Sequence, residues 1–245
     1  MYYNWNYFDK IYCISTTNSY LRRSYFNYLA KKLNINFCMK IFEKHSTDSN
    51  YGCATSHLHI FKEAYLKNYK KILIFEDDVI ENYINPTILN KIINFLDNIE
   101  WDLFYFGAVP DCRKDNFCTK ISNNFYKIKS LCTHAYAINQ QAIKKYYNLI
   151  YYDIPIDYIF RDDSELKSYA HFPTQFFQET NFKVPQFVIN SYFKILEFYS
   201  YYIGINIRHP IYRIIISLFI IFLTYKLIRN NIRRNNIRNN IRNNI

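Results

Sequence analysis

Residues 71–79 read KILIFEDDV, and this stretch decides the fold class. Residues 71–75 form an apolar run that is too short for a helix, so we expect a central strand that is covered on both faces. Three acids follow at the carboxyl end of this strand: Glu76, Asp77 and Asp78, which we call the acidic triplet. Because open α/β sheets bind nucleotides at the carboxyl ends of their strands, the acidic triplet marks a candidate site.

Strand and helix patterns alternate on both sides of this stretch. Further strands are expected at residues 10–15, 37–42, 101–106, 133–138 and 168–173. Helices are expected at residues 20–33, 88–96 and 140–149, with another that is capped by Thr55 or Ser56 and runs to about residue 69. Gly107 is expected to stop the strand before it, and residues 109–124 to form a polar loop. The alternation predicts an α/β fold with a mixed central sheet flanked by helices.

A divalent cation would explain the acidic triplet chemically. Like charges a few ångströms apart raise each other's pKa, so three adjacent carboxylates are costly unless a cation neutralises them. Oxygen ligands suit Mn²⁺ or Mg²⁺, which can also bind a diphosphate. Since alternate residues of a strand share a face, Glu76 and Asp78 are expected to point together as metal ligands, with Asp77 pointing away. The alternative interpretation is a solvated acidic turn.

Several short motifs occur in the order and spacing of a known family. They are GCATSH at residues 52–57, KILIFEDDV at 71–79, WDLFYFG at 101–107, THAYAI at 133–138, PID at 155–157, Pro173 and Gln178. Together they resemble glycosyltransferase family 25, which includes bacterial lipooligosaccharide galactosyltransferases, collagen galactosyltransferases and relatives in large DNA viruses. The resemblance covers about residues 10–178. It departs from the family pattern after the first strand, where residues 15–18 read STTN in place of Asn-Leu-Asp-Arg.

The resemblance implies a GT-A-like nucleotide-sugar-binding fold and an inverting transfer of a hexose, most often galactose, from a UDP-sugar. The acidic triplet matches the family's metal and donor motif, with Mn²⁺ or Mg²⁺ held by Glu76 and Asp78. Arg22 and Arg23 are the candidates for the arginines that contact the nucleotide in this family. The acceptor would be a hydroxyl group on a glycan, a lipooligosaccharide or other lipid-linked sugar, or a protein.

An inverting transfer needs a carboxylate that accepts the proton of the attacking hydroxyl group. Asp157 is the first candidate, because Pro155 stiffens the chain before it and would hold its side chain at a pocket rim. Asp102 is the second candidate. The alternative for Asp157 is a loop acid or helix cap, and the alternative for Asp102 is a structural role.

Cys53 and His57 are spaced about one helical turn apart, which would also suit a Cys–His nucleophilic pair. No third group that would orient such a pair is evident, so we expect both residues to serve packing and loop structure. None of the six cysteines has the spacing of a zinc finger, which favours free thiols in a reducing compartment. The alternative is a bridge between Cys112 and Cys118 in a secreted protein.

Two other functions are compatible with the sequence. The same carboxylates could serve a metal-dependent phosphohydrolase, although the sequence offers no second cluster of ligands for a two-metal site. The other possibility is a catalytically degenerate protein of the same fold that acts as a membrane-bound binding protein. The unusual stretch at residues 15–18 and the repetitive tail suggest this second possibility.

The C-terminal part of the chain differs in composition from the body. Nine of the 31 basic residues but only one acid lie from Lys194 onward, so the net charge of +11 belongs mostly to the tail. The body is therefore not expected to bind nucleic acid. Residues 214–225 are twelve uncharged and mostly apolar residues, and a basic low-complexity repeat follows them.

We therefore expect a glycosyltransferase domain at residues 1–193, a hydrophobic helical segment at 194–228 and a basic low-complexity tail at 229–245. As a helix, the twelve uncharged residues would span about 18 Å, less than the roughly 30 Å core of a bilayer. The start of the chain lacks the features of a signal peptide. These facts together predict attachment to the cytoplasmic side of a membrane, with a buried C-terminal helix as the alternative.

Overall fold

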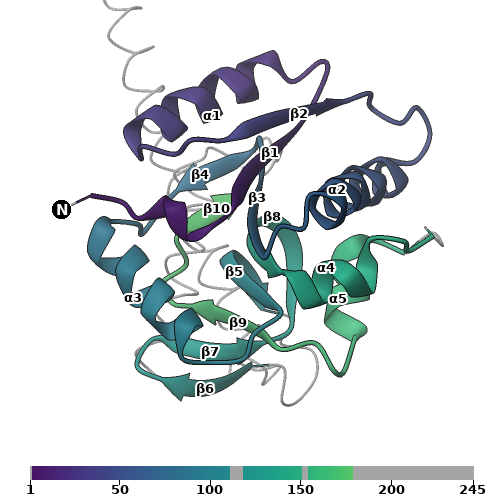
Figure 1. The fold of residues 1–245 in the computed structure, drawn as a ribbon. Helices are drawn as coiled ribbons and strands as arrows, with labels where there is room; N and C mark the ends of the chain where they lie inside the picture. The colour runs from purple at the N-terminus through teal and green to yellow at the C-terminus, as the bar shows by residue number, and fades with distance from the viewer. Residues whose placement is uncertain (1, 111–117, 151–153, 179–245) are drawn as a thin grey trace, which may run out of the picture. The chain divides into compact units, whose positions relative to one another are not determined.

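A mixed sheet of eight strands forms the centre of the described part of the protein (Figure 1). The computed structural model describes residues 2–110, 118–150 and 154–178, all of which lie in one compact unit. In spatial order the strands are β2 (Cys38–Phe42), β1 (Lys10–Thr16), β3 (Lys71–Glu76), β8 (Ser130–Asn139), β5 (Leu103–Pro110), β9 (Ser168–His171), β7 (Phe125–Ile128) and β6 (Cys118–Ser122). Strands β2, β1 and β3 are parallel, whereas β8 runs antiparallel between β3 and β5. The predicted mixed central sheet is confirmed.

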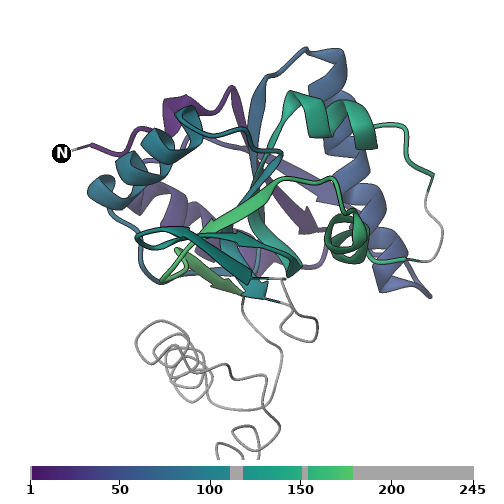
Figure 2. The same ribbon diagram turned by 90° about the horizontal axis from the view of Figure 1, so that it is seen from below.

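Helices cover both faces of this sheet, as Figures 1 and 2 show. They are the short 3₁₀ helix η1 (Trp5–Tyr7) and the α-helices α1 (Tyr20–Lys32), α2 (Ser49–Leu66), α3 (Pro86–Asp97), α4 (Gln140–Tyr146) and α5 (Ile156–Asp162). Helices α1 and α3 belong to one apolar core, and α2, α4 and α5 belong to the other. Strand β3 contributes side chains to both cores. Leu73 and Phe75 belong to the first core, and Ile72 and Ile74 belong to the second. The prediction of a central strand covered on both faces is confirmed.

A small second sheet begins directly after the acidic triplet. Strand β4 (Val79–Glu81) pairs antiparallel with β10 (Phe176–Gln178), so the last described residues lie next to the turn that carries the triplet (Figure 1). Phe176 is fully buried and packs edge-on against Phe75 at the end of β3. This packing fixes the end of β3 from the side opposite to α2.

Helix α2 begins earlier than the sequence predicted. Asp48 caps it by accepting hydrogen bonds from the backbone N–H groups of Asn50 and Tyr51, at 2.8 and 3.0 Å. Thr55 and Ser56 do not cap the helix, because their hydroxyl groups donate to backbone carbonyls about one turn earlier. The prediction was wrong because the Asp48 cap outweighs the weak helix propensity of the glycine at residue 52. As a result, residues 52–54, which were expected before the helix, lie inside it.

Gly107 does not stop strand β5, which continues to Pro110. A Cβ atom at this position would lie only 2.0 Å from Nε2 of His134 and 2.9 Å from the carbonyl oxygen of Phe176. Glycine is therefore needed because His134 and β10 approach the β5 backbone closely. The pairing of β5 with β8 shifts register on both sides of Gly107, which accommodates this approach.

A β-hairpin occupies part of the region that was expected to be a loop. Strands β6 and β7 pair antiparallel, with Asn124 in the turn at a φ of 71°. Four of the five β6 residues are exposed, so the strand lacks the apolar alternation by which a sequence reveals a strand. The one local feature of the sequence that indicates this hairpin is Asn124, because Asn is favoured at the positive φ of hairpin turns.

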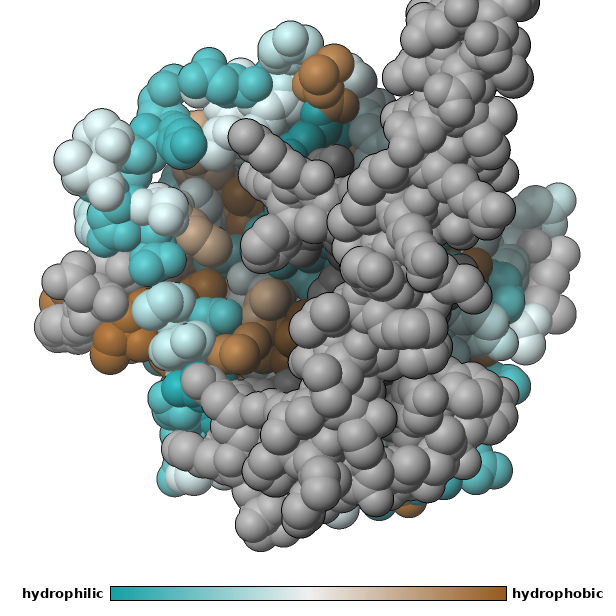
Figure 3. All heavy atoms as spheres, turned by 180° about the vertical axis from the view of Figure 1, so that it is seen from behind, coloured by the Kyte–Doolittle hydropathy of each residue, from teal (hydrophilic) through white to brown (hydrophobic). Residues whose placement is uncertain are grey.

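The described surface includes exposed large apolar side chains, among them Tyr20, Leu21 and Tyr28 of α1. Figure 3 shows hydrophobic and hydrophilic residues interspersed on one face. None of the helices in the described ranges is both long enough and apolar enough to cross a bilayer. The hydrophobic segment predicted at residues 194–228 and the tail at 229–245 lie outside the described residues, as does Cys112.

Candidate functional site

A pocket of about 430 Å³ opens at the carboxyl edge of β1 and β3. Its wall consists of the end of β1 and the loop after it, the first turn of α1, the loop before α2, one side of α2 and the acidic triplet. The lining residues are Ile14, Ser15, Thr16, Asn18, Ser19, Arg22, Glu43, Lys44, His45, Ser49, Gly52, Cys53, Ser56, His57, Glu76, Asp77 and Asp78. This volume is within the range of small-molecule sites in proteins, roughly 300–1,000 Å³.

All three members of the acidic triplet line this pocket. Strand β3 ends at Glu76, and Asp77 and Asp78 lie in the turn that leads into β4. The expectation that Asp77 points away from the other two was wrong, because the alternation of side chains applies only within a strand. The chain turns after Glu76 and brings Asp77 back to the pocket.

Asp77 and Asp78 share one arginine. The guanidinium group of Arg22 lies 3.8 Å from Oδ1 of Asp77 and 3.6 Å from Oδ2 of Asp78. Ser15 at the end of β1 donates a hydrogen bond to Asp77, and Gln178 at the end of β10 donates one to Asp78, at 3.3 Å. The other oxygen of Asp78, Oδ1, is buried and makes no hydrogen bond among the described residues.

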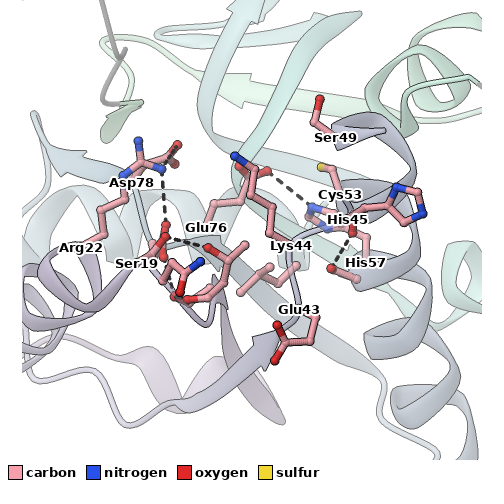
Figure 4. Close-up of a pocket in the computed structure, with 17 residues that line it drawn as sticks. Ser19, Arg22, Glu43, Lys44, His45, Ser49, Cys53, His57, Glu76 and Asp78 are labelled. Atoms are coloured by element: carbon pink, nitrogen blue, oxygen red, sulfur yellow. Dashed lines mark hydrogen bonds and ion pairs between the residues drawn. The ribbon is translucent and has the colours of Figure 1, made fainter. Parts of the chain in front are cut away.

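Glu76 faces the opposite wall of the pocket. Its Oε1 accepts a hydrogen bond from the hydroxyl group of Thr133 at 2.9 Å and lies 3.4 Å from Nε2 of His57. His57 itself is fully buried on α2, and its Nδ1 is 2.9 Å from the hydroxyl group of Tyr136 on β8. Figure 4 shows the resulting division, with Arg22 and Asp78 on one side, Cys53 and His57 on the other, and Glu76 between them.

The three carboxylates differ in their electrostatics. Burial raises the pKa of Asp78 to about 7, the negative charge of Glu76 acts in the same direction, and the positive charge of Arg22 opposes both. Burial also raises the pKa of Asp77, against the hydrogen bond from Ser15. For Glu76, burial would raise the pKa, but the interactions with His57, His134 and Thr133 together outweigh burial and leave the pKa lowered. The pocket is therefore short of positive charge beside Asp78.

The two predicted arginines have different positions. Arg22 lines the pocket beside the acidic triplet. Arg23 is not among the lining residues; its guanidinium group donates to the hydroxyl group of Ser15 at 3.2 Å and to the backbone carbonyl of Thr17 at 3.0 Å. Arg22 is thus the arginine that can meet a ligand, and Arg23 fixes the loop that follows β1.

Asp157 lies in the first turn of α5 and does not line the pocket. Its carboxylate accepts hydrogen bonds from the backbone N–H groups of Cys132 and Tyr158, both at 3.0 Å. Cys132 directly precedes Thr133, which holds Glu76. The structure therefore connects Asp157 to the acidic triplet through the backbone of β8.

Asp102 is at the other end of the sheet. It precedes β5, and its carboxylate accepts a hydrogen bond from the backbone N–H group of Lys167 at 2.9 Å. Leu103 pairs with Ile138, which pairs in turn with Ile72 near the start of β3. The acidic triplet follows the opposite end of β3, so the fold does not bring Asp102 to the pocket.

Cys53 was predicted to serve packing, but in the structure it is exposed and lines the pocket. The ligand atoms of Cys53, His57 and Glu76 all lie within 4.8 Å of one another. The signal for this cluster was the spacing of four residues between Cys53 and His57, which places both on one face of a helix. What the sequence could not show is that this face meets the end of β3.

The chain matches the family model for glycosyltransferase family 25 (LPS biosynthesis protein) over residues 38–160. No curated protein sequence matches it. Among solved structures, similarity extends to A197 from STIV, with 15% identity over 70% of this chain and 95% of that one and a TM-score of 0.43.

Two further solved structures have comparable similarity. A glycosyltransferase involved in the glycosylation of the major capsid of PBCV-1 is 13% identical over 76% of this chain and 99% of its own, with a TM-score of 0.42. UDP-glucose pyrophosphorylase complexed with UDP-glucose is 12% identical over 76% of this chain and 81% of its own, with a TM-score of 0.43. The family match spans half of the chain and contains the acidic triplet: the protein belongs to glycosyltransferase family 25 and is a glycosyltransferase.

Proposed function

We propose that the protein has a GT-A-like fold and transfers a hexose, most simply galactose, from a UDP-sugar to a hydroxyl group with inversion. The acceptor class that we propose is a glycan, a lipooligosaccharide or other lipid-linked sugar, or a protein. The observation that carries the donor assignment is that the acidic triplet and Arg22 line one pocket at the carboxyl edge of the sheet. Such an edge is where α/β proteins bind nucleotides.

The residues at this edge fit a hard divalent cation such as Mn²⁺ or Mg²⁺. Three carboxylates line the pocket, and the buried Oδ1 of Asp78 makes no hydrogen bond among the described residues. Oxygen ligands of this kind are those that Mn²⁺ and Mg²⁺ prefer. We propose Glu76 and Asp78 as the ligands. When bound, the ion would neutralise the negative charge that develops on the departing diphosphate.

Arg22 supplies a second positive charge for the donor. Its guanidinium group is partly exposed and lies within 4 Å of both Asp77 and Asp78, so it faces the space that a diphosphate would occupy. Arg23 supports the donor site indirectly, because it holds the β1–α1 loop in place.

In the proposed reaction, the acceptor oxygen forms a bond to the anomeric carbon while the bond between that carbon and UDP breaks. The electron pair of the broken bond leaves with UDP, and the hydroxyl proton passes to a carboxylate. We propose Asp157 for this role rather than Asp102, because Asp157 is held against β8 one residue from Thr133. Asp102 lies at the far end of the sheet.

The test is a donor screen. The purified full chain is incubated with a panel of UDP-sugars, with and without Mn²⁺, and UDP release is measured together with donor binding by calorimetry. We expect one UDP-hexose to bind and to be turned over only with the metal. The proposal fails if none of the donors binds or is consumed, and release of inorganic phosphate without a sugar requirement would indicate a phosphohydrolase instead.

We also propose that residues 194–228 attach the enzyme to the cytoplasmic side of a membrane, as a segment separate from the domain at residues 1–193. The support is compositional: residues 214–225 carry no charge, and the repeat after them is rich in arginine. Basic residues beside an apolar segment favour an anionic leaflet by about 1 kcal/mol each.

A further inference from the structure

On one wall of the pocket, a thiol and an imidazole lie beside the first carboxylate of the acidic triplet. They are Cys53 and His57 of α2 and Glu76 of β3, which we call the thiol cluster. Their ligand atoms lie within 4.8 Å of one another. The cluster brings together a sulfur, an imidazole nitrogen and a carboxylate oxygen, which is the ligand set typical of Zn²⁺ rather than of Mn²⁺ or Mg²⁺.

The histidine of the thiol cluster is placed as a metal ligand would be. His57 is fully buried, and its Nε2 makes no hydrogen bond among the described residues, since the 3.4 Å contact with Oε1 of Glu76 lacks hydrogen-bond geometry. Its other nitrogen, Nδ1, lies 2.9 Å from the hydroxyl group of Tyr136. In metal sites, the second ring nitrogen of a histidine ligand is oriented by such a partner, which leaves the first one free to bind the ion.

The carboxylate is supported in the same way. Thr133 donates a hydrogen bond to Oε1 of Glu76 at 2.9 Å and so holds the carboxylate toward His57. Ligand atoms of a tetrahedral Zn²⁺ are about 3.3–3.7 Å apart, given metal–ligand bonds of about 2.0–2.3 Å. The 3.4 Å separation of His57 and Glu76 already matches this spacing. Cys53 is exposed to the pocket and can complete the site by a change of rotamer.

We propose that Cys53, His57 and Glu76 form a site for a thiophilic divalent cation, Zn²⁺ in the first place, with the fourth position open to the pocket. On binding, the Cys53 thiol loses its proton to solvent. The N–H group at Nδ1 of His57 then donates a hydrogen bond to the hydroxyl oxygen of Tyr136. Because Glu76 also belongs to the proposed donor site, occupation of the thiol cluster removes a carboxylate from that site. Zn²⁺ therefore inhibits the enzyme, a consequence that depends on the proposed function, whereas the metal site itself does not.

Cobalt provides a test of the site that does not require activity. Co²⁺ is added to the full chain under reducing conditions, and the absorption spectrum is recorded. We expect a thiolate-to-cobalt charge-transfer band in the near ultraviolet, which Zn²⁺ abolishes by displacement. The band should be lost in Cys53→Ser and retained in the matched control Cys38→Ser, whose half-buried thiol lies at the start of β2 and does not line the pocket.

Two results would overturn the metal site: no such band in the wild-type chain, or an undiminished band in Cys53→Ser. A third variant, Tyr136→Phe, keeps all three ligands and removes only the group that orients His57. We expect it to weaken cobalt binding at least about tenfold. Unchanged affinity in this variant would contradict the orientation of His57 that the proposal requires.

Inhibition is measured separately, with each variant compared with its own rate in the absence of zinc. The zinc concentration for half inhibition should rise at least about tenfold in Cys53→Ser and stay at the wild-type value in Cys38→Ser. Equal inhibition of both variants would show that zinc acts elsewhere. It would overturn the inference that zinc inhibits the enzyme by binding the thiol cluster. If no UDP-sugar is turned over at all, the proposed function fails, while the cobalt spectrum still decides the metal site.

Discussion

Asp78 is the residue on which the proposed donor site depends most. It is buried beside Arg22, and its pKa is raised to about 7 by burial and by the charge of Glu76. We predict that Asp78→Asn lowers kcat/KM for the UDP-sugar by at least about 100-fold, because it removes a charge that the donor site uses. Folding should not suffer, since burial disfavours the ionised carboxylate and the neutral amide has the same shape.

The matched control for this prediction is Glu81→Gln, which neutralises an acid three residues further on that pairs with Lys32 outside the pocket. This variant should keep kcat/KM within about twofold of the wild type, as expected for a surface ion pair. Steady-state kinetics and urea unfolding of both variants are the measurements. Equal activity of the two variants would remove Asp78 from the site.

Gly107 gives a second prediction at the scale of one residue. Because a Cβ atom would lie 2.0 Å from His134 and 2.9 Å from the backbone of Phe176, Gly107→Ala should lower the free energy of unfolding by at least about 2 kcal/mol. The comparison is Gly52→Ala in α2, where the nearest atom, Cβ of His45, is 3.2 Å away and helix propensity favours alanine. Urea titration of both variants should show a much smaller loss, or a gain, for Gly52→Ala.

At the scale of elements, strand β9 ends in the buried His171. From this residue we predict how the free energy of unfolding depends on pH. Burial lowers the pKa of His171 to about 4, and its Nδ1 lies 3.0 Å from Nε2 of Gln175 and 3.3 Å from the carbonyl oxygen of Pro173. The unfolded chain takes up a proton near pH 6.5, so His171 contributes a loss of stability as the pH falls from about 6.5 to about 4. At about pH 5 this loss should be about 2 kcal/mol.

The variant His171→Asn tests this, because Asn keeps a polar side chain at this position but does not titrate. Unfolding free energies of the wild type and the variant are compared at about pH 7.5 and about pH 5. The variant should lose less stability between the two values than the wild type does. The matched control is His59→Asn, which removes an exposed histidine of α2; an identical pH dependence of wild type and His171→Asn would contradict the prediction.

At the scale of the whole molecule, the open prediction concerns the C-terminal segment. Deleting residues 205–245 should move the protein from the membrane fraction to the supernatant, because the deletion removes the uncharged run and most of the basic residues of the tail. The measurement is fractionation of cells that express the full or the shortened chain. A shortened chain that still sediments with membranes would overturn attachment through this segment.

Most elements could be predicted because their signals are local. The apolar run at residues 71–75 and the helical spacing at residues 20–33 determine structure by which side chains must be buried, and both predictions are confirmed. The start of α2 and the hairpin of β6 and β7 were missed because a cap and an exposed strand carry weak local signals. The family was likewise predicted from the order of short motifs and is confirmed.

By itself, the sequence determined the α/β class, the central position of β3, the acidic end of that strand and the family. Only the tertiary structure decided which residues meet there: Arg22 but not Arg23 lines the pocket, Asp102 lies at the opposite edge, and Cys53 joins Glu76. The physical reason is that burial and periodicity act over a few neighbouring residues, whereas a site is assembled where strand ends and helix faces from distant parts of the chain converge.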